Sequence, residues 1–180
     1  MSTVLIQHLK KQPPKALLLD LDGVFYCFSD TPILNRYDMG LEEYLVQQHG
    51  LSVAEANQRR QAWFQRYGNT ARGAKAELGA DPVAMSDHAT QYVDYHQLQP
   101  CALLRQDLLQ LAQACQLHLA TNAHQPHAEN VLQHLALADV IPPHQRTTIC
   151  DNGWVGKPDP SYFALLLKRT QCQPHEVLFI

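Results

Sequence analysis

From residue 100 onward, short apolar segments alternate with amphipathic segments that have helical spacing. The apolar segments at 117–123, 147–150 and 176–180 have the length and composition of buried strands. Strands that alternate with helices at this spacing form βαβ units, which predicts a parallel sheet. An apolar run at 16–19, flanked by chain-breaking residues, predicts another strand that is buried on both faces. The expected helices lie at 101–115, 127–138 and 159–172.

The middle third of the chain, 38–96, has a different pattern that is helical throughout. Ser52 and Glu55 form a capping-box pattern, and the helix that they open is expected to end at Gly68. Asp81, followed by a proline, marks the start of another helix. A shorter helix is expected between these two. The sequence therefore predicts a helical insertion in an α/β protein.

The length of 180 residues suits one core with an insertion folded onto it. We predict a discontinuous α/β core formed by 1–26 and 97–180, with a helical cap at 27–96. Apolar residues make up 46% of the chain and charged residues 17%, which is enough for a core and gives no sign of disorder.

Charge and hydropathy exclude some classes of partner. The net charge is −3 and no run of Lys or Arg exceeds two residues, which argues against a nucleic-acid surface. The longest aliphatic or aromatic run, 163–167, is far shorter than the roughly 20 residues of a membrane helix. We expect neither a nucleic acid nor a membrane as partner. The sequence does not indicate an oligomeric state.

The chain also has features of a cytoplasmic protein. In residues 1–15 a short apolar triplet precedes the lysines, whereas a secretory leader has its charges first and a longer apolar stretch after them. The five cysteines are odd in number and form no CxxC pair, which favours reduced thiols over a disulfide framework or a zinc site. We therefore expect a cytoplasmic location.

Polar side chains follow the predicted strands where each strand ends. Asp20 and Asp22 come directly after the first strand, and Thr121 and Asn122 follow the second. Lys157 lies in a loop before a helix. Because ligands of an open parallel sheet bind beyond the carboxyl ends of its strands, these groups should meet at one edge.

Two carboxylates, a hydroxyl, an amide and an ammonium group suit phosphoryl transfer. One carboxylate can attack phosphorus, and a second one two residues further on can protonate the leaving oxygen and later activate water. A lysine and a magnesium ion can offset the negative charge. A carboxylate and a backbone carbonyl are plausible Mg²⁺ ligands, since Mg²⁺ prefers oxygen and keeps several waters.

The segments "LLLDLDGV", "LATNA" and "GKPDP" occur in this order and resemble the first three motifs of the haloacid dehalogenase-like superfamily. The helical insertion is similar in position to the C1 cap of that superfamily. The segments "YGNTARGAKAELGADP" and "TNAHQPHAENVLQHLAL" further resemble its pyrimidine 5′-nucleotidase branch. The resemblance covers most of the chain from Lys15 onward. It implies a three-layer, Rossmann-like parallel core with a C1-type cap.

The resemblance also implies a role for each motif residue. Asp20 would be the nucleophile and Asp22 the general acid and base. Thr121 and Asn122 would bind phosphate, and Lys157 would stabilise its charge. The side chain of Asp20 and the backbone carbonyl of Asp22 would bind Mg²⁺. Superfamily members that dehalogenate carbon lack a carboxyl at the second position, so Asp22 favours phosphate chemistry.

The stretch "YGNTARG" lies, by resemblance, where the cap meets the active site. Tyr67, Asn69, Thr70 and Arg72 could therefore select the leaving group, because an arginine can bind phosphate or a base edge and a tyrosine can stack. The alternative interpretation is structural: Gly68 ends one helix, and Asn69 or Thr70 caps the next. Both interpretations remain open from the sequence.

Two pairs of residues have a structural interpretation that we favour over a functional one. Trp63 and Phe64 are expected in the core of the cap and not against a ligand. His124 and His127 could suggest a metal site, but no further ligands of suitable spacing are evident and Mg²⁺ avoids imidazole. We expect these histidines at the start of a helix that follows the phosphate loop.

The segment Val177 to Ile180 predicts a last core strand. In the superfamily this strand leads into a fourth motif, an acidic pair that completes the magnesium site, and this sequence holds no such pair after it. A short apolar strand at a bare sheet edge is also an aggregation hazard. We therefore expect that the sequence is a truncated form of a longer phosphatase.

The function that the sequence favours is Mg²⁺-dependent hydrolysis of a small phosphorylated metabolite, with nucleoside 5′-monophosphates as candidates. One alternative is a catalytically silent scaffold that binds phosphate or a partner without the fourth motif. Another is a phosphotransferase that passes the phosphoryl group to a sugar hydroxyl. The sequence does not name the substrate, because selectivity lies in cap contacts.

Overall fold

The computed structural model describes residues 9, 11, 13–29 and 31–180. Four strands form one parallel sheet in the order β3-β2-β1-β4. The predicted α/β fold with a parallel sheet is confirmed. The strands are β1 (Ala16–Leu19), β2 (Gln116–Ala120), β3 (Arg146–Thr147) and β4 (Val177–Phe179).

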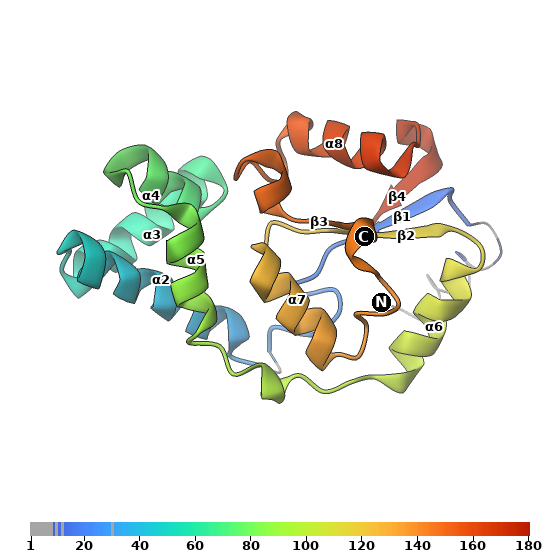
Figure 1. Ribbon diagram of the computed structural model, residues 1–180, viewed down its shortest axis with the longest axis horizontal. Helices are drawn as coiled ribbons and strands as arrows, with labels where there is room; N and C mark the ends of the chain where they lie inside the picture. Colours follow the sequence, from blue (N-terminus) through green and yellow to red (C-terminus); the bar gives the residue numbers. More distant parts are fainter. Residues whose placement is uncertain (1–8, 10, 12, 30) are drawn as a thin grey trace.

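Helices cover both faces of the sheet, which gives the core three layers (Figure 1). The side chains of β1 alternate between the faces: Leu17 and Leu19 belong to one apolar cluster, and Leu18 belongs to another. The first cluster includes residues of α6 (Ala102–Ala112) and α7 (Gln125–His134), and the second includes residues of α8 (Pro160–Thr170). A strand that is apolar at every position is therefore buried on both sides, as expected for a parallel sheet.

Four helices pack against one another beside the sheet (Figure 1). We call this unit, residues 33–90, the cap. Its apolar core includes Leu45, Trp63 and Met85, which are almost fully buried. The boundaries of the cap at residues 27 and 96 stay a prediction. The helices are α2 (Ile33–His49), α3 (Val53–Tyr67), α4 (Thr70–Leu78) and α5 (Pro82–Thr90).

The helix signals of the cap act where the sequence predicts them. Ser52 and Glu55 form a capping box at the start of α3, and Gly68 ends that helix in the left-handed conformation. Asp81 accepts the backbone N–H of Val83 at the start of α5.

The prediction for the segment 147–150 is wrong in its extent. The strand β3 comprises only Arg146–Thr147, and the chain then turns into a short 3-10 helix, Ile149–Asn152. The cause is a local capping box: Asp151 accepts hydrogen bonds from both the backbone and the hydroxyl of Thr148. Further 3-10 helices lie at Tyr95–Gln97, Pro143–Gln145 and Pro174–Glu176.

Two further predictions differ from the structure. The helical pattern was expected to extend to residue 96, but the helix that starts after Asp81 ends at Thr90. The segment after Thr90 connects the cap to the core. The long helix α2 was not predicted over its first residues, which precede 38.

All five cysteines are free thiols. The prediction about the N-terminal leader concerns residues that lie mostly outside the described part of the chain. Among the described residues, every helix is too short or too polar to cross a membrane.

Candidate active site

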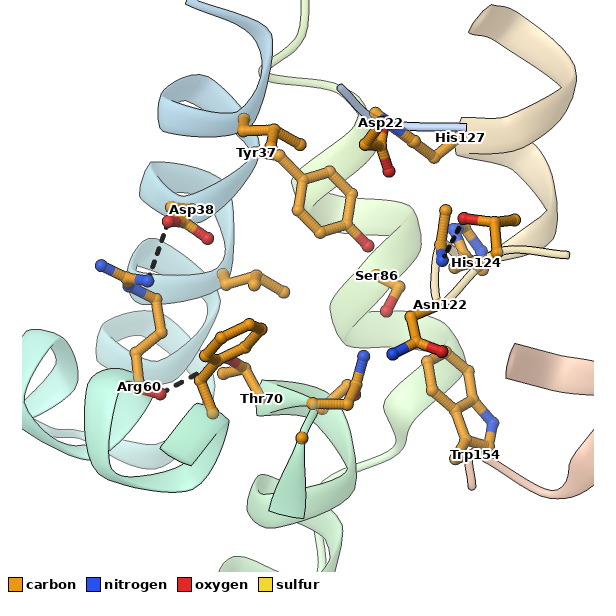
Figure 2. Close-up of a pocket in the computed structure, with 18 of the residues that line it drawn as sticks. Asp22, Tyr37, Asp38, Arg60, Thr70, Ser86, Asn122, His124, His127 and Trp154 are labelled. Atoms are coloured by element: carbon orange, nitrogen blue, oxygen red, sulfur yellow. Dashed lines mark hydrogen bonds and ion pairs between the residues drawn. The ribbon is translucent and has the colours of Figure 1, made fainter. Parts of the chain in front are cut away.

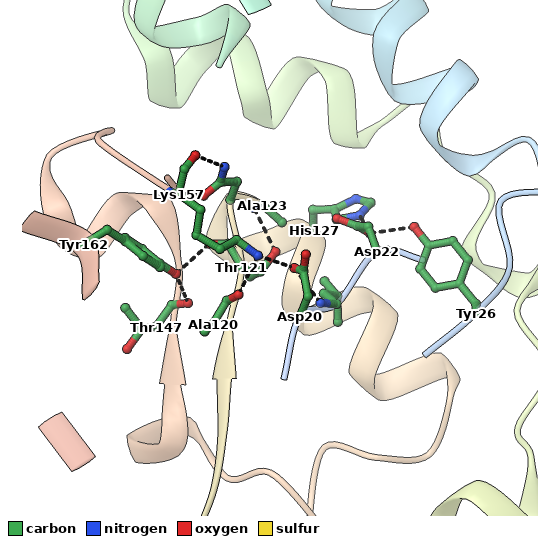
Figure 3. A network of polar contacts seen from close by, with 12 residues as sticks. Asp20, Asp22, Tyr26, Ala120, Thr121, Ala123, His127, Thr147, Lys157 and Tyr162 are labelled. Atoms are coloured by element: carbon green, nitrogen blue, oxygen red, sulfur yellow. Dashed lines mark hydrogen bonds and ion pairs between the residues drawn. The ribbon is translucent and has the colours of Figure 1, made fainter. Parts of the chain in front are cut away.

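The register of the sheet brings the predicted site residues together. Leu19 of β1 pairs with Leu119 of β2, so Asp20 and Thr121 both leave the sheet at its carboxyl edge. Lys157 reaches the same edge from the loop before α8, where its Nζ donates to the carbonyl of Ala120 at 2.9 Å (Figure 3). The structure therefore places residues from three separate segments at one edge of the sheet.

Asp20 is held by the lysine and by the backbone. Its Oδ1 lies 2.7 Å from Nζ of Lys157 and accepts the N–H of Leu21 at 2.8 Å. Its own N–H donates to the carbonyl of Ile180 at 2.8 Å. The carboxylate is nevertheless 32% exposed, which leaves it accessible to a ligand. Burial lowers the pKa of Lys157 although the charges of Asp20 and Asp22 oppose this.

Asp22 lies in a network of hydrogen bonds (Figure 3). Its Oδ1 accepts the hydroxyl of Tyr26 at 2.6 Å and lies 3.1 Å from Nε2 of His127. Burial acts to raise the pKa of Asp22, but its partners His127, Tyr26 and Lys157 together outweigh burial and lower it. These partners therefore favour the ionised form of the carboxyl.

His127 is a site residue that the sequence interpretation missed. Its ring is 3% exposed, and its second nitrogen, Nδ1, lies 2.8 Å from the hydroxyl of Tyr95. The sequence places this histidine in the first turn of a helix, which is correct, since α7 begins at Gln125. Its contact with Asp22 depends on how α7 packs against the loop after β1, and no local pattern encodes that.

The loop after β2 is fixed by reciprocal hydrogen bonds. The side chain of Asn122 donates to the carbonyl of Lys157 at 2.9 Å and accepts its N–H at 2.7 Å. A Cβ atom at Gly156 would overlap the amide of Asn122, so this position requires glycine. Thr121, which is 1% exposed, accepts the N–H of Ala123 at 3.0 Å. Asn122 thus positions the loop that carries Lys157.

A cavity of about 360 Å³ lies between the sheet edge and the cap (Figure 2). All five residues predicted at the sheet edge line it. The cap contributes apolar and polar groups to the opposite wall. The lining residues are Asp20, Asp22, Leu34, Tyr37, Asp38, Leu41, Arg60, Phe64, Gly68, Asn69, Thr70, Ala71, Ser86, Thr121, Asn122, Ala123, His124, His127, Trp154 and Lys157.

The cap wall holds an arginine that two carboxylates neutralise. Nη1 of Arg60 lies 2.8 Å from Oδ2 of Asp38 (Figure 2). Its Nε lies 2.6 Å from Oε1 of Glu42. Burial raises the pKa of Asp38 although Arg60 opposes this. With both carboxylates ionised, this group of three side chains has a net charge of −1 and offers no free cation to a ligand.

The four predicted cap residues divide into two pairs. Asn69 and Thr70 line the cavity. Asn69 also accepts the N–H of Arg72 as the cap of α4, which confirms the structural interpretation, while its role in selecting the leaving group stays a prediction. Tyr67 and Arg72 do not line the cavity, in contrast to the prediction. The hydroxyl of Tyr67 donates to Glu77 at 3.1 Å, and the guanidinium of Arg72 donates to the carbonyl of Tyr67 at 3.4 Å.

The prediction for Trp63 and Phe64 is correct for one residue only. Trp63 is 2% exposed and belongs to the cap core, as expected. Phe64 is 61% exposed and lines the cavity, so its assignment to the core was wrong. Successive residues of a helix are rotated by about 100°, and only one of two adjacent aromatics can face the narrow core of a small helical unit.

His124 joins the core to the cap. It stands at the start of α7, as predicted, and its Nε2 lies 2.9 Å from Oδ1 of Asp87 on α5. Its ring stacks on Trp154 with the centroids 6.2 Å apart. Burial lowers its pKa although Asp87 opposes this. The described residues contain no group of three or more His, Cys, Asp or Glu side chains that could hold a metal ion.

The oxygen ligands for Mg²⁺ are suitable in kind but few in number. The carboxylate of Asp20 and the backbone carbonyl of Asp22 are hard oxygen donors two residues apart in the chain. Mg²⁺ keeps several of its waters and commonly takes only one or two carboxylates together with phosphate oxygens. The described residues add no third acidic ligand here.

Known proteins resemble this chain in sequence and in fold. Residues 14–180 match the family of haloacid dehalogenase-like hydrolases. A HAD family hydrolase from Deinococcus radiodurans R1, solved with bound phosphate and sodium, has 15% identity and a TM-score of 0.51, and the similarity covers 93% of this chain and 72% of that one. An L-2-haloacid dehalogenase from Xanthobacter autotrophicus, with chloropropionic acid covalently bound, has 20% identity and a TM-score of 0.52 over 92% and 69%.

A protein assigned as a beta-phosphoglucomutase from Thermotoga maritima has 20% identity and a TM-score of 0.53, with 92% of this chain and 74% of that chain covered. These similarities show a common fold for proteins with different chemistry. The family match extends over nearly the whole chain and includes the segments that carry Asp20, Thr121 and Lys157. The chain belongs to the haloacid dehalogenase-like hydrolase family.

Proposed function

We propose that this chain hydrolyses small phosphomonoesters through an aspartyl-phosphate intermediate. The observation that carries the proposal is the meeting of Asp20, Asp22, Thr121, Asn122 and Lys157 on one wall of the cavity. Asp22 supports phosphate chemistry because it supplies a second carboxyl for proton transfer beside the nucleophile. The solved relative with bound phosphate is consistent with this choice.

In the first step, a carboxylate oxygen of Asp20 attacks phosphorus while the bond to the leaving oxygen breaks. The carboxyl of Asp22 gives its proton to the leaving oxygen, which departs as an alcohol. Lys157, whose Nζ is 2.7 Å from Asp20, offsets negative charge on the transferring group. Thr121 and Asn122 are the residues that we assign to the phosphate oxygens: the hydroxyl of Thr121 can donate to them, and Asn122 holds the loop that carries Lys157.

In the second step, the carboxylate of Asp22 takes a proton from water as the water oxygen attacks phosphorus. The bond between phosphorus and Asp20 breaks, which releases inorganic phosphate and restores both carboxyl groups. Because the hydrogen bonds of Asp22 lower its pKa, its ionised form is well suited to this second step. The first step requires that Asp22 gain a proton when the anionic substrate binds.

Mg²⁺ is the cofactor that we propose for this site. The side chain of Asp20 and the backbone carbonyl of Asp22 would hold it, together with the phosphate of the substrate and several waters. When bound, it supplies positive charge that offsets the charge of the phosphoryl oxygens.

The cap wall favours a leaving group without a second anionic group. Arg60 is paired with two carboxylates, and Lys157 is paired with Asp20. The cations that line the cavity within the described residues are therefore committed to internal partners. Phe64 and Tyr37 of the cap and Trp154 of the core add apolar surface, and Ser86, Asn69 and Thr70 add hydrogen-bonding groups. A nucleoside 5′-monophosphate has a phosphate at one end and an uncharged leaving group that suits such a wall.

The same charges argue against the phosphotransferase alternative. A sugar phosphate that accepts a second phosphoryl group carries two anionic groups at once, and the cap wall offers no unpaired cation for the second one among the described residues. No observation favours the silent scaffold over hydrolysis. The two are separated by measuring turnover.

The test is release of inorganic phosphate from a panel of phosphomonoesters with and without Mg²⁺. We expect Mg²⁺-dependent release that Asp20→Asn abolishes. Asp81→Asn is the matched control, because it makes the same chemical change at a helix cap where asparagine is an equally good capping residue. Turnover that persists in Asp20→Asn would refute the nucleophile, and phosphate binding without turnover would support the silent scaffold.

A further inference from the structure

We propose that His127 is a positioning residue for Asp22: it holds Oδ1 of that carboxyl, so that Oδ2 is the oxygen that exchanges the proton with the substrate and with water. This inference rests on the proposed function, to which it adds His127 as the residue that positions Asp22 and Oδ2 as the atom that carries the proton. No motif in the sequence interpretation gave this role to His127.

Two donors from separate elements converge on one oxygen of Asp22 (Figure 3). The hydroxyl of Tyr26, from the loop after β1, lies 2.6 Å from Oδ1. Nε2 of His127, from the first turn of α7, lies 3.1 Å from the same atom. A carboxylate bonded from two directions cannot rotate freely about its last torsion.

The ring of His127 is itself fixed. Its Nδ1 lies 2.8 Å from the hydroxyl of Tyr95, and its edge packs on Tyr37 with the centroids 5.3 Å apart. Burial raises the pKa of Tyr95, which keeps its hydroxyl protonated and able to donate. With Tyr95 donating to Nδ1, a neutral ring carries its hydrogen on Nε2 and donates it to Asp22.

The hydrogen bonds of Oδ1 decide which oxygen of Asp22 remains available. A carboxylate oxygen has about two lone-pair positions for hydrogen bonds, and Tyr26 and His127 occupy both positions of Oδ1. Tyr26 is the donor in its contact, because an ionised carboxylate can only accept hydrogen bonds. A proton that Asp22 gives or takes is therefore carried by Oδ2.

The role predicts an effect that depends on the leaving group. An ester with a basic leaving oxygen needs a proton from Asp22 in the first step, whereas one with an acidic leaving group departs with little help. Phenyl phosphate and p-nitrophenyl phosphate are close in size and differ in this property. We expect His127→Leu to lower kcat/KM about 100-fold for phenyl phosphate and about tenfold or less for p-nitrophenyl phosphate.

Two variants serve as controls for the fold and the site. His127→Gln retains one donor and one acceptor, so it should bring kcat/KM for phenyl phosphate back to within about tenfold of the unmodified chain. His144→Leu makes the same chemical change at an exposed histidine in the 3-10 helix Pro143–Gln145, and should leave the ratio between the two esters unchanged. If His127→Leu does not fold, Tyr95→Phe tests the same contact from its far side, with a smaller loss in the same direction.

Equal losses with the two esters in His127→Leu would overturn the inference, because a merely structural role lowers both alike. Failure of His127→Gln to recover activity would also count against it. Absence of turnover by the unmodified chain with both esters is a distinct result: it would refute the proposed function, and the inference with it.

Discussion

A buried histidine in the central sheet should make the stability of this protein fall at mildly acidic pH. His118 lies on β2, the strand that leads to Thr121, and is 1% exposed. Its Nε2 lies 2.8 Å from the hydroxyl of Thr147. Burial lowers its pKa from 6.5 to about 4, the charges of Arg169 and His144 add to the effect, and Asp151 opposes it.

The direction of this change in stability follows from the linkage between proton binding and folding. The neutral form is favoured in the folded state, so the unfolded state binds the proton first as the pH falls below 6.5. The contribution of His118 to stability is therefore fully present above pH 6.5, and it is lost progressively as the pH falls to the folded pKa near 4. With these two values, the loss that is due to His118 between pH 7 and pH 5 is about 2 kcal/mol.

The test compares the unmodified chain with His118→Gln, which can keep a hydrogen bond to Thr147 but does not titrate. Urea unfolding at both pH values gives the free energy of unfolding of each protein. We expect the unmodified chain to lose about 2 kcal/mol more than the variant. His124, which is also buried, is present in both proteins and cancels in the difference. An equal loss in both proteins would refute a buried, neutral His118.

Three other substitutions test the packing and the charges of the site. Gly156→Ala should lower kcat/KM for p-nitrophenyl phosphate about tenfold, because the new methyl group displaces Asn122 and with it the active-site lysine. Gly40→Ala should lower the free energy of unfolding in urea by about 1–3 kcal/mol, since its Cβ would lie 2.6 Å from Cα of Ala89 on the facing helix. Asp38→Asn leaves the arginine of the cap wall with one carboxylate, and should raise kcat/KM for 4-carboxyphenyl phosphate relative to phenyl phosphate about threefold or more.

Each of these substitutions has a control nearby. Gly153→Ala changes a second glycine of the same loop, where an added Cβ meets open space, so kcat/KM should be unchanged. It should cost about 1 kcal/mol of stability, because the backbone there has the left-handed conformation that favours glycine. Met39→Ala changes an exposed neighbour of Gly40 and should be close to neutral. Asp81→Asn removes a cap carboxylate outside the cavity and should not alter the preference between esters. A variant that behaves like its control would contradict the corresponding argument.

The edge of the sheet could be predicted because its determinants are local and repeated. Apolar runs that end in polar residues define strand ends, and a parallel sheet brings all such ends to one side. This pattern places Asp20, Thr121 and Asn122 at the carboxyl edge, and the register of β1 and β2 agrees with it. The short β3 was not predicted in its true extent, since the side chain of Asp151 ends the strand through a contact that competes with the sheet.

The cap wall could not be predicted, because a small rotation of a helix changes which residues face the cavity. Asn69 and Thr70 line it while Tyr67, at the end of the preceding helix, turns toward Glu77. Phe64 faces the cavity although its neighbour Trp63 is buried. Such differences follow from the packing of α2, α3, α4 and α5 on one another and not from spacing in one segment.

The contact between His127 and Asp22 also depends on how separate segments pack together, so it could not be predicted from the sequence. The sequence shows a histidine in the first turn of a helix, and this alone fits many structural roles. Its partners lie in the loop after β1 and in the 3-10 helix Tyr95–Gln97. A histidine with ring nitrogens that bond to a carboxylate and a tyrosine is recognised only when all three segments are in place.

Tyr26 and Tyr95 connect the carboxyl of Asp22 to the two segments that join the core to the cap. The chain passes between core and cap twice, and Tyr26 lies in the first connection while Tyr95 lies in the second. Tyr26 bonds to Asp22 directly, and Tyr95 does so through His127. Neither tyrosine is among the residues that line the cavity. In the proposed reaction, a substitution in either connection would therefore alter the hydrogen bonds of the carboxyl that exchanges the proton without changing the surface that meets the substrate.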